Sequence, residues 1–565
     1  MTTKRGLGPA LSAPVTLWLL LAFAAPIAVV VILSLRDTTD PFAPILGPLS
    51  PALYLSILGD SFYLDVILET LLLGLAVTFC SAVLGYPLAW WLSRLPSRWR
   101  PLGFALILIP ILTNVVVRSL GIMLLLAPQG LLNGVLSVFG LPSFDHMLFS
   151  HGAVIVGLTQ VFMPFMVLAL YDSLQGNSAR VHEAAESLGA SPCVRFLTVD
   201  LPLSLSGLRS GMVIVFLMAI TAYVSATLLG GKKVWTVGML ILQEAIANLN
   251  APMAAALSIL LTAIGILSAV LLSWLFSRLM PWHQGRPGRP LPLPPRAVLK
   301  VLDMAGPLIA RLCLLAAILL LLLPLALVIV QSFNDVPIAT AAGFRGFTLH
   351  WYHEVLFGGA YGPALWISVK LAVCAALVAL TLALPAAFAL ARYPFAGRSA
   401  LAAFWLLPLS LPSIALGVGM LRLLQVYLWL PPFLAMVMIH SVVILPFVLT
   451  LLLSSVLSLD RSQEEAAETL GAGPVRRFLL VILPALSPGI FAATLVGFLN
   501  SFGEVTVTSF LTTPRITTLP VRIYSEASFL LEPTAHAISA MLIVLTTALL
   551  IVLGRFIRLD RVYAR

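Results

Sequence analysis

The sequence predicts an all-α polytopic membrane protein with about 12 transmembrane helices, arranged as two parallel six-helix repeats. Composition is the first reason: 60% of the 565 residues are apolar, only 10% are charged, and mean hydropathy is +1.07. A soluble protein is roughly 45–50% apolar and about 25% charged. The other two reasons are a series of long apolar runs and a polar segment that occurs twice.

A transmembrane helix needs about 20 mostly apolar residues, and continuous runs of this length exclude the short alternating strands of a β-barrel. Twelve runs qualify, and we expect one spanning helix in each: 15–35, 64–93, 102–127, 149–171, 209–230, 252–279, 309–332, 366–392, 400–425, 432–456, 489–511 and 535–557. The first run is too long for the apolar core of a signal peptide, so it is predicted to be a retained helix.

The distribution of positive charge predicts the orientation, because Lys and Arg are enriched in cytoplasmic loops. With the N-terminus inside, 23 of the 32 Lys and Arg residues fall in the inner segments. We therefore expect both termini to be cytoplasmic. The net charge of +10 is then explained by contact with anionic membrane lipid, and nucleic acid is not predicted as a partner.

A Pro-rich stretch, residues 281–296, lies between the sixth and seventh runs and is typical of a semi-rigid spacer. It predicts a first transmembrane domain at 1–280, a Pro/Arg-rich cytoplasmic linker at 281–308 and a second domain at 309–565. An ordinary Pro-rich loop is the alternative.

An internal repeat supports two domains. Residues 183–202 read EAAESLGASPCVRFLTVDLP and residues 465–484 read EAAETLGAGPVRRFLLVILP, at a constant offset of 282. Upstream, Pro87 and Pro110 match Pro385 and Pro408 at an offset of 298. Because both copies are predicted on the same side of the membrane, the repeats are parallel.

Each repeated segment is predicted to form a short helix. Glu-Ala-Ala-Glu favours a helix with carboxylates near its positive end, and Gly189 or Gly471 supplies the freedom that a sharp helix stop needs. The small Ala residues and one Leu form a short apolar face that fits a groove on another protein. The alternative is an amphipathic helix resting on the bilayer.

This pattern resembles the EAA loop of binding-protein-dependent ABC importer permeases, in which such loops are coupling helices that dock on ATP-hydrolysing subunits. The first half resembles the spermidine/putrescine-type permease through PILTNVVVR (110–118), GLLN (130–133) and LLGGK (228–232). The second half resembles its partner permease through LARYPF (390–395), LLPLSLPS (406–413) and TLPVRIY (518–524). The chain thus looks like two permeases fused into one.

The resemblance implies a non-catalytic transport subunit of the bacterial cytoplasmic membrane, with no cofactor of its own. Its implied partners are a homodimer of ABC ATPases, which bind ATP and Mg, and a periplasmic or extracellular solute-binding protein. The implied ATPase-coupling residues are Glu183, Ala184, Ala185, Gly189, Glu465, Ala466, Ala467 and Gly471. Consistently, the sequence contains no G-x-x-x-x-G-K-[ST] phosphate loop.

Charges within the apolar runs are costly and call for an explanation. Glu504 falls in the eleventh run and could attract a cationic solute or act as an interhelical hydrogen-bond partner. Arg118, in the third run, could line the route or pair with a helix dipole or acidic neighbour, and would favour an anionic or zwitterionic solute. Glu504, Arg118 and Asn114 are the predicted substrate-pathway residues, and no metal site is predicted.

The predicted function is therefore the permease of an ATP-driven importer of a small polar solute. The resemblance favours a polyamine, while phosphonate, ferric iron and other small organic solutes stay open. The alternative is a 6+6-helix secondary transporter driven by an ion gradient, which has no use for two matched docking loops.

Overall fold

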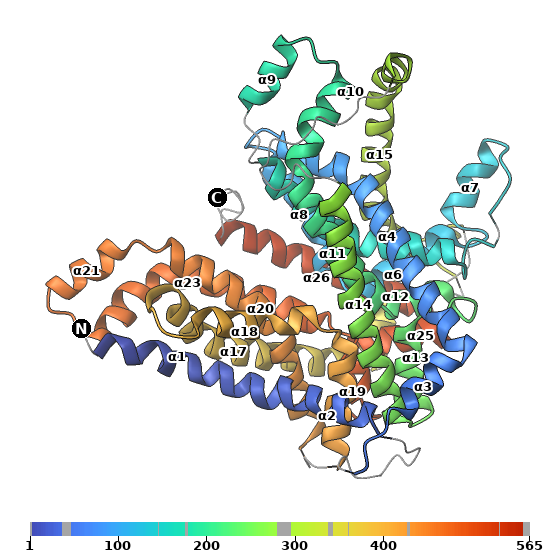
Figure 1. The fold of residues 1–565 in the computed structure, drawn as a ribbon. Helices are drawn as coiled ribbons and strands as arrows, with labels where there is room; N and C mark the ends of the chain where they lie inside the picture. The colour runs from blue at the N-terminus through green and yellow to red at the C-terminus, as the bar shows by residue number, and fades with distance from the viewer. Residues whose placement is uncertain are drawn as a thin grey trace.

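The computed structural model describes residues 3–36, 47–144, 146–175, 179–279, 295–336, 343–359, 361–426, 430–529 and 532–556. Within these ranges the chain is helical, and eleven helices are long and apolar enough to cross a membrane, or twelve if one sharply bent pair counts as a single span. The predicted fold class is confirmed. Two bundles of long helices run in crossing directions and meet at one end (Figure 1).

The first half begins with an interrupted long helix and ends with α14. Its helices are α1 (Thr3–Leu19), α2 (Ala25–Ser34), α3 (Ala52–Gly59), α4 (Ser61–Ser93), α5 (Arg100–Leu112), α6 (Val115–Leu126), α7 (Leu131–Val138), α8 (His151–Gln175), α9 (Ala179–Ser187), α10 (Pro192–Arg195), α11 (Leu201–Thr221), α12 (Val224–Gly230), α13 (Val237–Leu242) and α14 (Ala251–Leu279). Single π-helical turns at Leu20–Ala24 and Phe196–Asp200 join α1 to α2 and α10 to α11.

The second half repeats this order, except that the single helix α15 stands where the first half has α1 and α2, and that α7 has no counterpart among the described residues. Its helices are α15 (Arg296–Gln331), α16 (His350–Phe357), α17 (Gly362–Arg392), α18 (Arg398–Ser410), α19 (Ser413–Val426), α20 (Pro432–Ser458), α21 (Arg461–Thr469), α22 (Pro474–Arg477), α23 (Leu483–Phe502), α24 (Thr508–Leu511), α25 (Leu519–Phe529) and α26 (Thr534–Phe556). A π-helical turn at Phe478–Ile482 joins α22 to α23, 282 residues after its first-half counterpart.

The repeat extends over more of the chain than the matching prolines indicated. Helices α5 and α18 begin and end exactly 298 residues apart, and α9 and α21 exactly 282 residues apart. Even single contacts repeat: the Tyr54 hydroxyl bonds to Ser34 at 2.7 Å, and Tyr352 bonds to Ser332 at 2.6 Å, both at the offset of 298.

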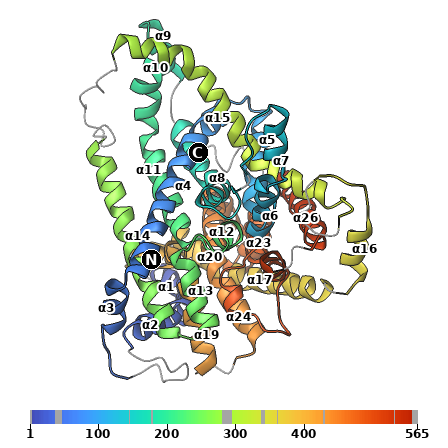
Figure 2. The same ribbon diagram turned by 90° about the vertical axis from the view of Figure 1, so that its right-hand side faces the viewer.

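The two halves exchange their first helices. Helices α1 and α2 pack against α17 and α19 of the second half, while α15 packs against α4 and α6 of the first (Figures 1 and 2). Glycines allow the closest approaches at these crossings. A Cβ on Gly121 of α6 would lie 2.3 Å from the Pro324 carbonyl oxygen of α15, and one on Gly419 of α19 would lie 2.3 Å from that of Pro26 in α2. The exchange therefore interlocks the halves at two repeat-related points.

Four of the predicted spans are wrong as continuous helices. The run at 102–127 is broken at residues 113–114, the run at 209–230 at 222–223, the run at 400–425 at 411–412 and the run at 489–511 at 503–507. The second of these breaks ends a span that runs over Pro192–Thr221, and the last ends one over Pro474–Phe502. Apolar composition could not reveal the breaks, because residues on both sides of each are equally apolar.

The predicted linker at 281–308 is corrected at one end. Its last residues, 296–308, form the first turns of α15, which begins directly after Pro295. A proline before the first helical residue blocks no hydrogen bond within the helix, so the helix can start there. Residues 281–294 of the predicted linker lie outside the described ranges.

Replacing Gly121 or Gly419 with Ala is expected to lower the thermal unfolding midpoint of the purified protein. The new methyl group meets a backbone oxygen that cannot rotate away, and overpacking of this kind costs about 1–3 kcal/mol. Gly134→Ala in α7 is the matched control, because nothing lies within 4 Å of its added Cβ. Equal midpoints for all three variants would contradict the close crossings.

Candidate substrate cavity and repeated loops

The two repeated segments fold alike to the level of single hydrogen bonds. Helices α9 and α21 each stop at a glycine in the left-handed conformation, Gly189 with φ +77° and Gly471 with φ +79°. The N–H groups of Gly189 and Gly471 donate to the carbonyls of Glu186 and Glu468 at 2.9 and 3.0 Å. This closing turn is why glycine is needed at both positions.

The two glutamates of each segment play different structural roles. Glu186 and Glu468 form ion pairs with Arg195 and Arg477, which lie nine residues further along and themselves match at the offset of 282. These pairs tie each short helix to the start of the next one, and sequence reasoning missed them, although the constant offset was a usable signal. Among the predicted coupling residues, Glu183, Ala184, Gly189, Glu465, Ala466 and Gly471 are exposed, Ala185 is half-buried and Ala467 is buried.

A leucine protrudes from the end of each loop. Leu188 is 88% exposed and Leu470 is 87% exposed, again at the offset of 282. Both follow the Glu-Ala-Ala-Glu helix directly, so each loop presents one large apolar side chain beside the exposed Ala184 or Ala466.

The two loops are anchored to the bundle differently. In the second half, Arg392 at the end of α17 bonds to Glu464 at 2.8 Å and to the Leu459 carbonyl at 3.1 Å. In the first half, the Asp303 carboxylate of α15 accepts a hydrogen bond from the Cys193 N–H at 2.8 Å. The N-cap of α21 is Asp460, and the Ser462 N–H lowers the pKa of its exposed carboxyl.

A cavity of about 610 Å³ lies where the two halves meet, and all four helix breaks line it. Each break frees backbone groups from the helical ladder, and in a membrane such groups are tolerated only against protein or a cavity. Discontinuous helices of this kind form the solute sites of many transporters. The cavity is therefore the candidate substrate site.

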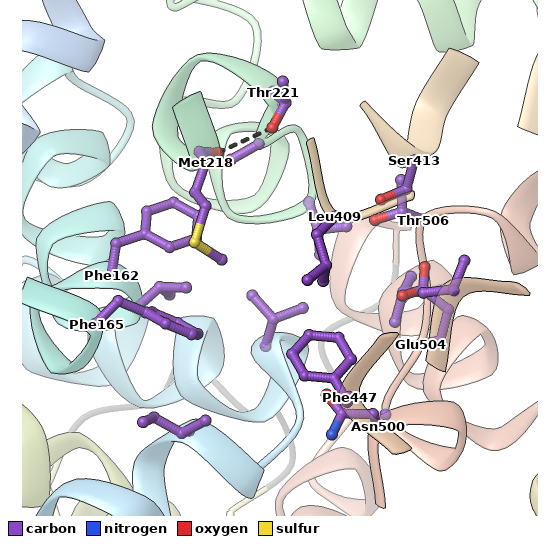
Figure 3. A pocket seen from close by; sticks show the side chains of 18 of the residues that line it. Phe162, Phe165, Met218, Thr221, Leu409, Ser413, Phe447, Asn500, Glu504 and Thr506 are labelled. Carbon is purple, nitrogen blue, oxygen red and sulfur yellow. Dashed lines mark hydrogen bonds between the residues drawn. The ribbon is translucent and has the colours of Figure 1, made fainter. Parts of the chain in front are cut away.

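Side chains of both halves line this cavity, and Figure 3 shows several of them. Ser413, Asn500, Glu504 and Thr506 of the second half gather on one side. The first half contributes large apolar side chains to the other, among them Phe162, Phe165 and Met218 (Figure 3).

All three predicted pathway residues line the cavity. Asn114 caps α6 by accepting from the Val116 N–H at 2.7 Å, and its amide donates to the Gly503 carbonyl of the other half at 3.0 Å. Glu504 lies in the break between α23 and α24, a correction to its predicted place in a helix, and accepts from the Val507 N–H at 3.0 Å.

Arg118 is buried, 6% exposed, on α6. One guanidinium nitrogen donates to the Val161 carbonyl at 3.4 Å, and its Nε has no hydrogen-bond partner among the described residues. No ion pair within the described part of the chain joins Arg118 to an acidic neighbour.

The end of the cavity away from the repeated loops is packed with side chains from both halves. The buried Tyr223 hydroxyl of the first half donates to Ser509 of the second at 3.0 Å, and its ring meets Tyr524 edge to face at 6.1 Å. Sequence reasoning did not select these residues, because an isolated Tyr in an apolar run gives no signal of a contact between halves.

His440 of α20 holds the second-half break in place. Its two ring nitrogens bond to the hydroxyls of Ser501 at 2.8 Å and Thr508 at 2.9 Å, one on each side of the break that carries Glu504. The first half has Leu158, Ala219 and Ala226 at the corresponding positions. The bridge is thus confined to the half with the acidic residue.

The comparisons with known proteins agree with this architecture. The model of the binding-protein-dependent transport system inner membrane component family matches residues 81–282 and again 379–559. The chain therefore belongs to this family, and the double match is consistent with a fused permease. It is the permease component of a binding-protein-dependent importer, and a multi-pass membrane protein.

Individual relatives match over shorter lengths. The spermidine/putrescine transport system permease protein PotB of Escherichia coli K12 is 35% identical over 223 residues, which is 39% of this chain and 80% of the relative. The putrescine transport system permease protein PotI of the same strain is 30% identical over 235 residues, again 39% and 80%. A bacterial alginate ABC transporter in complex with its periplasmic protein aligns with a TM-score of 0.40 at 14% identity, over 48% of this chain and 94% of that one.

We expect His440→Leu to destabilise the protein, because it removes the imidazole that joins Ser501 to Thr508 and leaves the buried Ser501 hydroxyl unsatisfied, whereas Thr508 keeps its bond to the Glu504 carbonyl. An unsatisfied buried polar group costs about 1–3 kcal/mol. The measurement is the thermal unfolding midpoint in detergent, with the exposed His353→Leu in α16 as control. An unchanged midpoint for His440→Leu would show that the bridge is unimportant.

Proposed function

We propose that this chain forms the membrane pathway of an ATP-driven importer for a small amine-bearing solute. A solute-binding protein delivers the solute to the end packed around Tyr223. A pair of ATPases binds the repeated loops on the opposite, cytoplasmic side, where both chain termini also lie. Alternating access of the cavity to the two sides carries the solute inward.

The observation that carries this proposal is the matched shape of α9 and α21. Both loops protrude at the ends of the bundles, far from the region where the halves meet (Figure 1). Each ends in a leucine exposed by almost nine-tenths, which is an unfavourable arrangement for an isolated loop in water. A groove on a partner protein would cover that leucine and the small alanines beside it.

Because the α9 and α21 loops have the same shape, one kind of ATPase subunit can bind both. Since Glu183 and Glu465, the glycine stops and the Glu–Arg pairs all repeat at one offset, two copies of a single ATPase can grip both loops equivalently. This favours a homodimer of ATPases over two different ones.

In the proposed coupling, movement of the two repeated loops changes how the two helix bundles are placed relative to each other. ATP-bound ATPases would draw α9 and α21 together and so bias the halves towards the state in which the Tyr223 end opens. Hydrolysis would release that bias. A motor can shift such a two-state equilibrium only by the difference in its binding energy for the two states, so the loop contacts must differ between them.

For the solute, the names of the relatives make polyamines the first candidates. Glu504 supports an amine, because a carboxylate in a membrane cavity gains most from a cationic partner. It is the single acidic residue among the described residues that line the cavity.

Glu183→Arg combined with Glu465→Arg is expected to abolish the stimulation of ATP hydrolysis by loaded binding protein in the reconstituted complex. Both glutamates are exposed and unpaired by any described ion pair, so folding should be unaffected while docking loses two favourable charges. A thermal unfolding midpoint equal to that of the wild-type chain is the control for folding. Wild-type stimulation in the loop variant would refute the proposed coupling.

The energy source separates this proposal from a gradient-driven transporter. Uptake into cells that express the complete importer should stop when ATP is depleted and continue when a protonophore removes the proton gradient at constant ATP. The opposite pattern would favour the secondary transporter.

A further inference from the structure

We propose that the cavity is built for a zwitterion, a solute with an amine at one end and an anionic group at the other. The inference rests on the proposed import function and narrows its substrate class. It follows from the two charges on the cavity wall, Arg118 and Glu504, which are the only cationic side chain and the only carboxylate among the described residues that line it.

The two charges come from different halves. Arg118 belongs to α6 of the first half and Glu504 to the break after α23 in the second, and no described ion pair joins them. Their repeat counterparts are Leu416 and Ala222, so neither charge is duplicated. The cavity therefore has one positive side and one negative side.

Arg118 and Glu504 both lie near one hydrogen bond between the halves. Asn114 touches Gly503, the neighbour of Glu504, at 3.0 Å, and Arg118 lies one helical turn, about 6 Å of rise, beyond Asn114 on the same helix. Both residues therefore line the same cavity close to this contact between the halves. Phe162 and Phe165 provide an apolar surface for the methylene groups between the ends of such a solute (Figure 3).

Arg118 lacks the compensation that a buried cation needs. A guanidinium has five N–H donors, yet among the described residues Arg118 has one long bond, of 3.4 Å to the Val161 carbonyl, and no partner for its Nε. A buried charge without a partner is strongly unfavourable. An anionic group of the solute would supply the missing acceptor in two parallel bonds, the geometry that guanidinium favours.

A polyamine fits the cavity wall around Arg118 and Glu504 less well than a zwitterion does. One of its amines can meet Glu504, but the next is brought towards the fixed charge of Arg118, and a low-dielectric site strengthens that repulsion. A dianion can bind Arg118 with one anionic group, but its second anionic group is repelled by the Glu504 carboxylate. Only a solute with both signs satisfies both ends.

The test uses the full-length chain in lipid nanodiscs and three five-carbon probes that differ only in their end groups: 5-aminopentanoate, 1,5-diaminopentane and glutarate. Isothermal titration should give a Kd for 5-aminopentanoate at least tenfold lower than for either other probe. A matching aminoalkylphosphonate shows whether the anionic end is better a carboxylate or a phosphonate.

Variants assign the preference to the two residues. Arg118→Gln should weaken 5-aminopentanoate at least fivefold and strengthen the diamine, and Glu504→Gln should weaken both amines and strengthen glutarate. Arg118→Lys keeps the charge and should keep the order of the probes, which guards against a folding defect in Arg118→Gln. Lys370→Gln removes an exposed cation of α17 outside the cavity lining and should change nothing.

Tighter binding of the diamine by the wild-type chain, no measurable binding of any probe, or an unchanged order in Arg118→Gln would each overturn the inference. These outcomes are separate from failure of the proposed function. ATP-dependent uptake of a diamine without preference for the zwitterion would refute only the charge assignment. Uptake that survives ATP depletion would refute the importer and leave the binding order as measured.

Discussion

The structure depends on one constraint: a backbone N–H or carbonyl group released from a helix inside a membrane must meet protein or a cavity. Here four helices are interrupted, and all four interruptions face the same space between the halves. The residues at the breaks compensate for part of the loss. Asn114 and Glu504 each accept a backbone N–H, and His440 joins the two sides of the second-half break. The cavity is therefore a consequence of where the helices stop, and two of its polar residues, Asn114 and Glu504, stabilise the stops.

The exchanged first helices determine how the halves can move. Gly121 against Pro324 and Gly419 against Pro26 are backbone-to-backbone crossings with no side chain between them, so these pairs of helices have little room to slide. Tight packing of this kind transmits displacement without yielding. The first helices also contact their own halves, α2 against α14 and α15 against α26, so each of them joins the two halves where it crosses. Elsewhere single hydrogen bonds connect the halves, such as Tyr223 to Ser509 and Asn114 to Gly503.

Much of this architecture could be predicted from the sequence. The helix breaks and the contacts between the halves could not, because hydropathy does not depend on them. The spanning regions, the duplicated loops and the left-handed glycines at 189 and 471 follow from composition and spacing. The breaks at 222–223 and 503–507 do not, because Ala222 and the apolar residues around Glu504 suit a helix as well as a loop. The placement of Arg118 and Glu504 in one cavity follows only from tertiary packing, since 386 residues separate them. The exchange of first helices could not be predicted from the sequence either, because both bundles have apolar surfaces on which α15 could pack.

The two halves are alike where they would meet a motor and unlike where they would meet a solute. The loops keep the same helix, the same glycine stop and the same Glu–Arg pair, as two equivalent subunits require. Around the cavity the pairs diverge: Arg118 and Leu416, Ala222 and Glu504, Leu158 and His440. A cavity between identical halves can present a charge only in duplicate and so suits a symmetric solute. Divergence between the halves removes that restriction, and a single cation opposite a single carboxylate can hold a solute in one orientation. The asymmetry of the wall is thus the physical basis for recognising a molecule with two different ends.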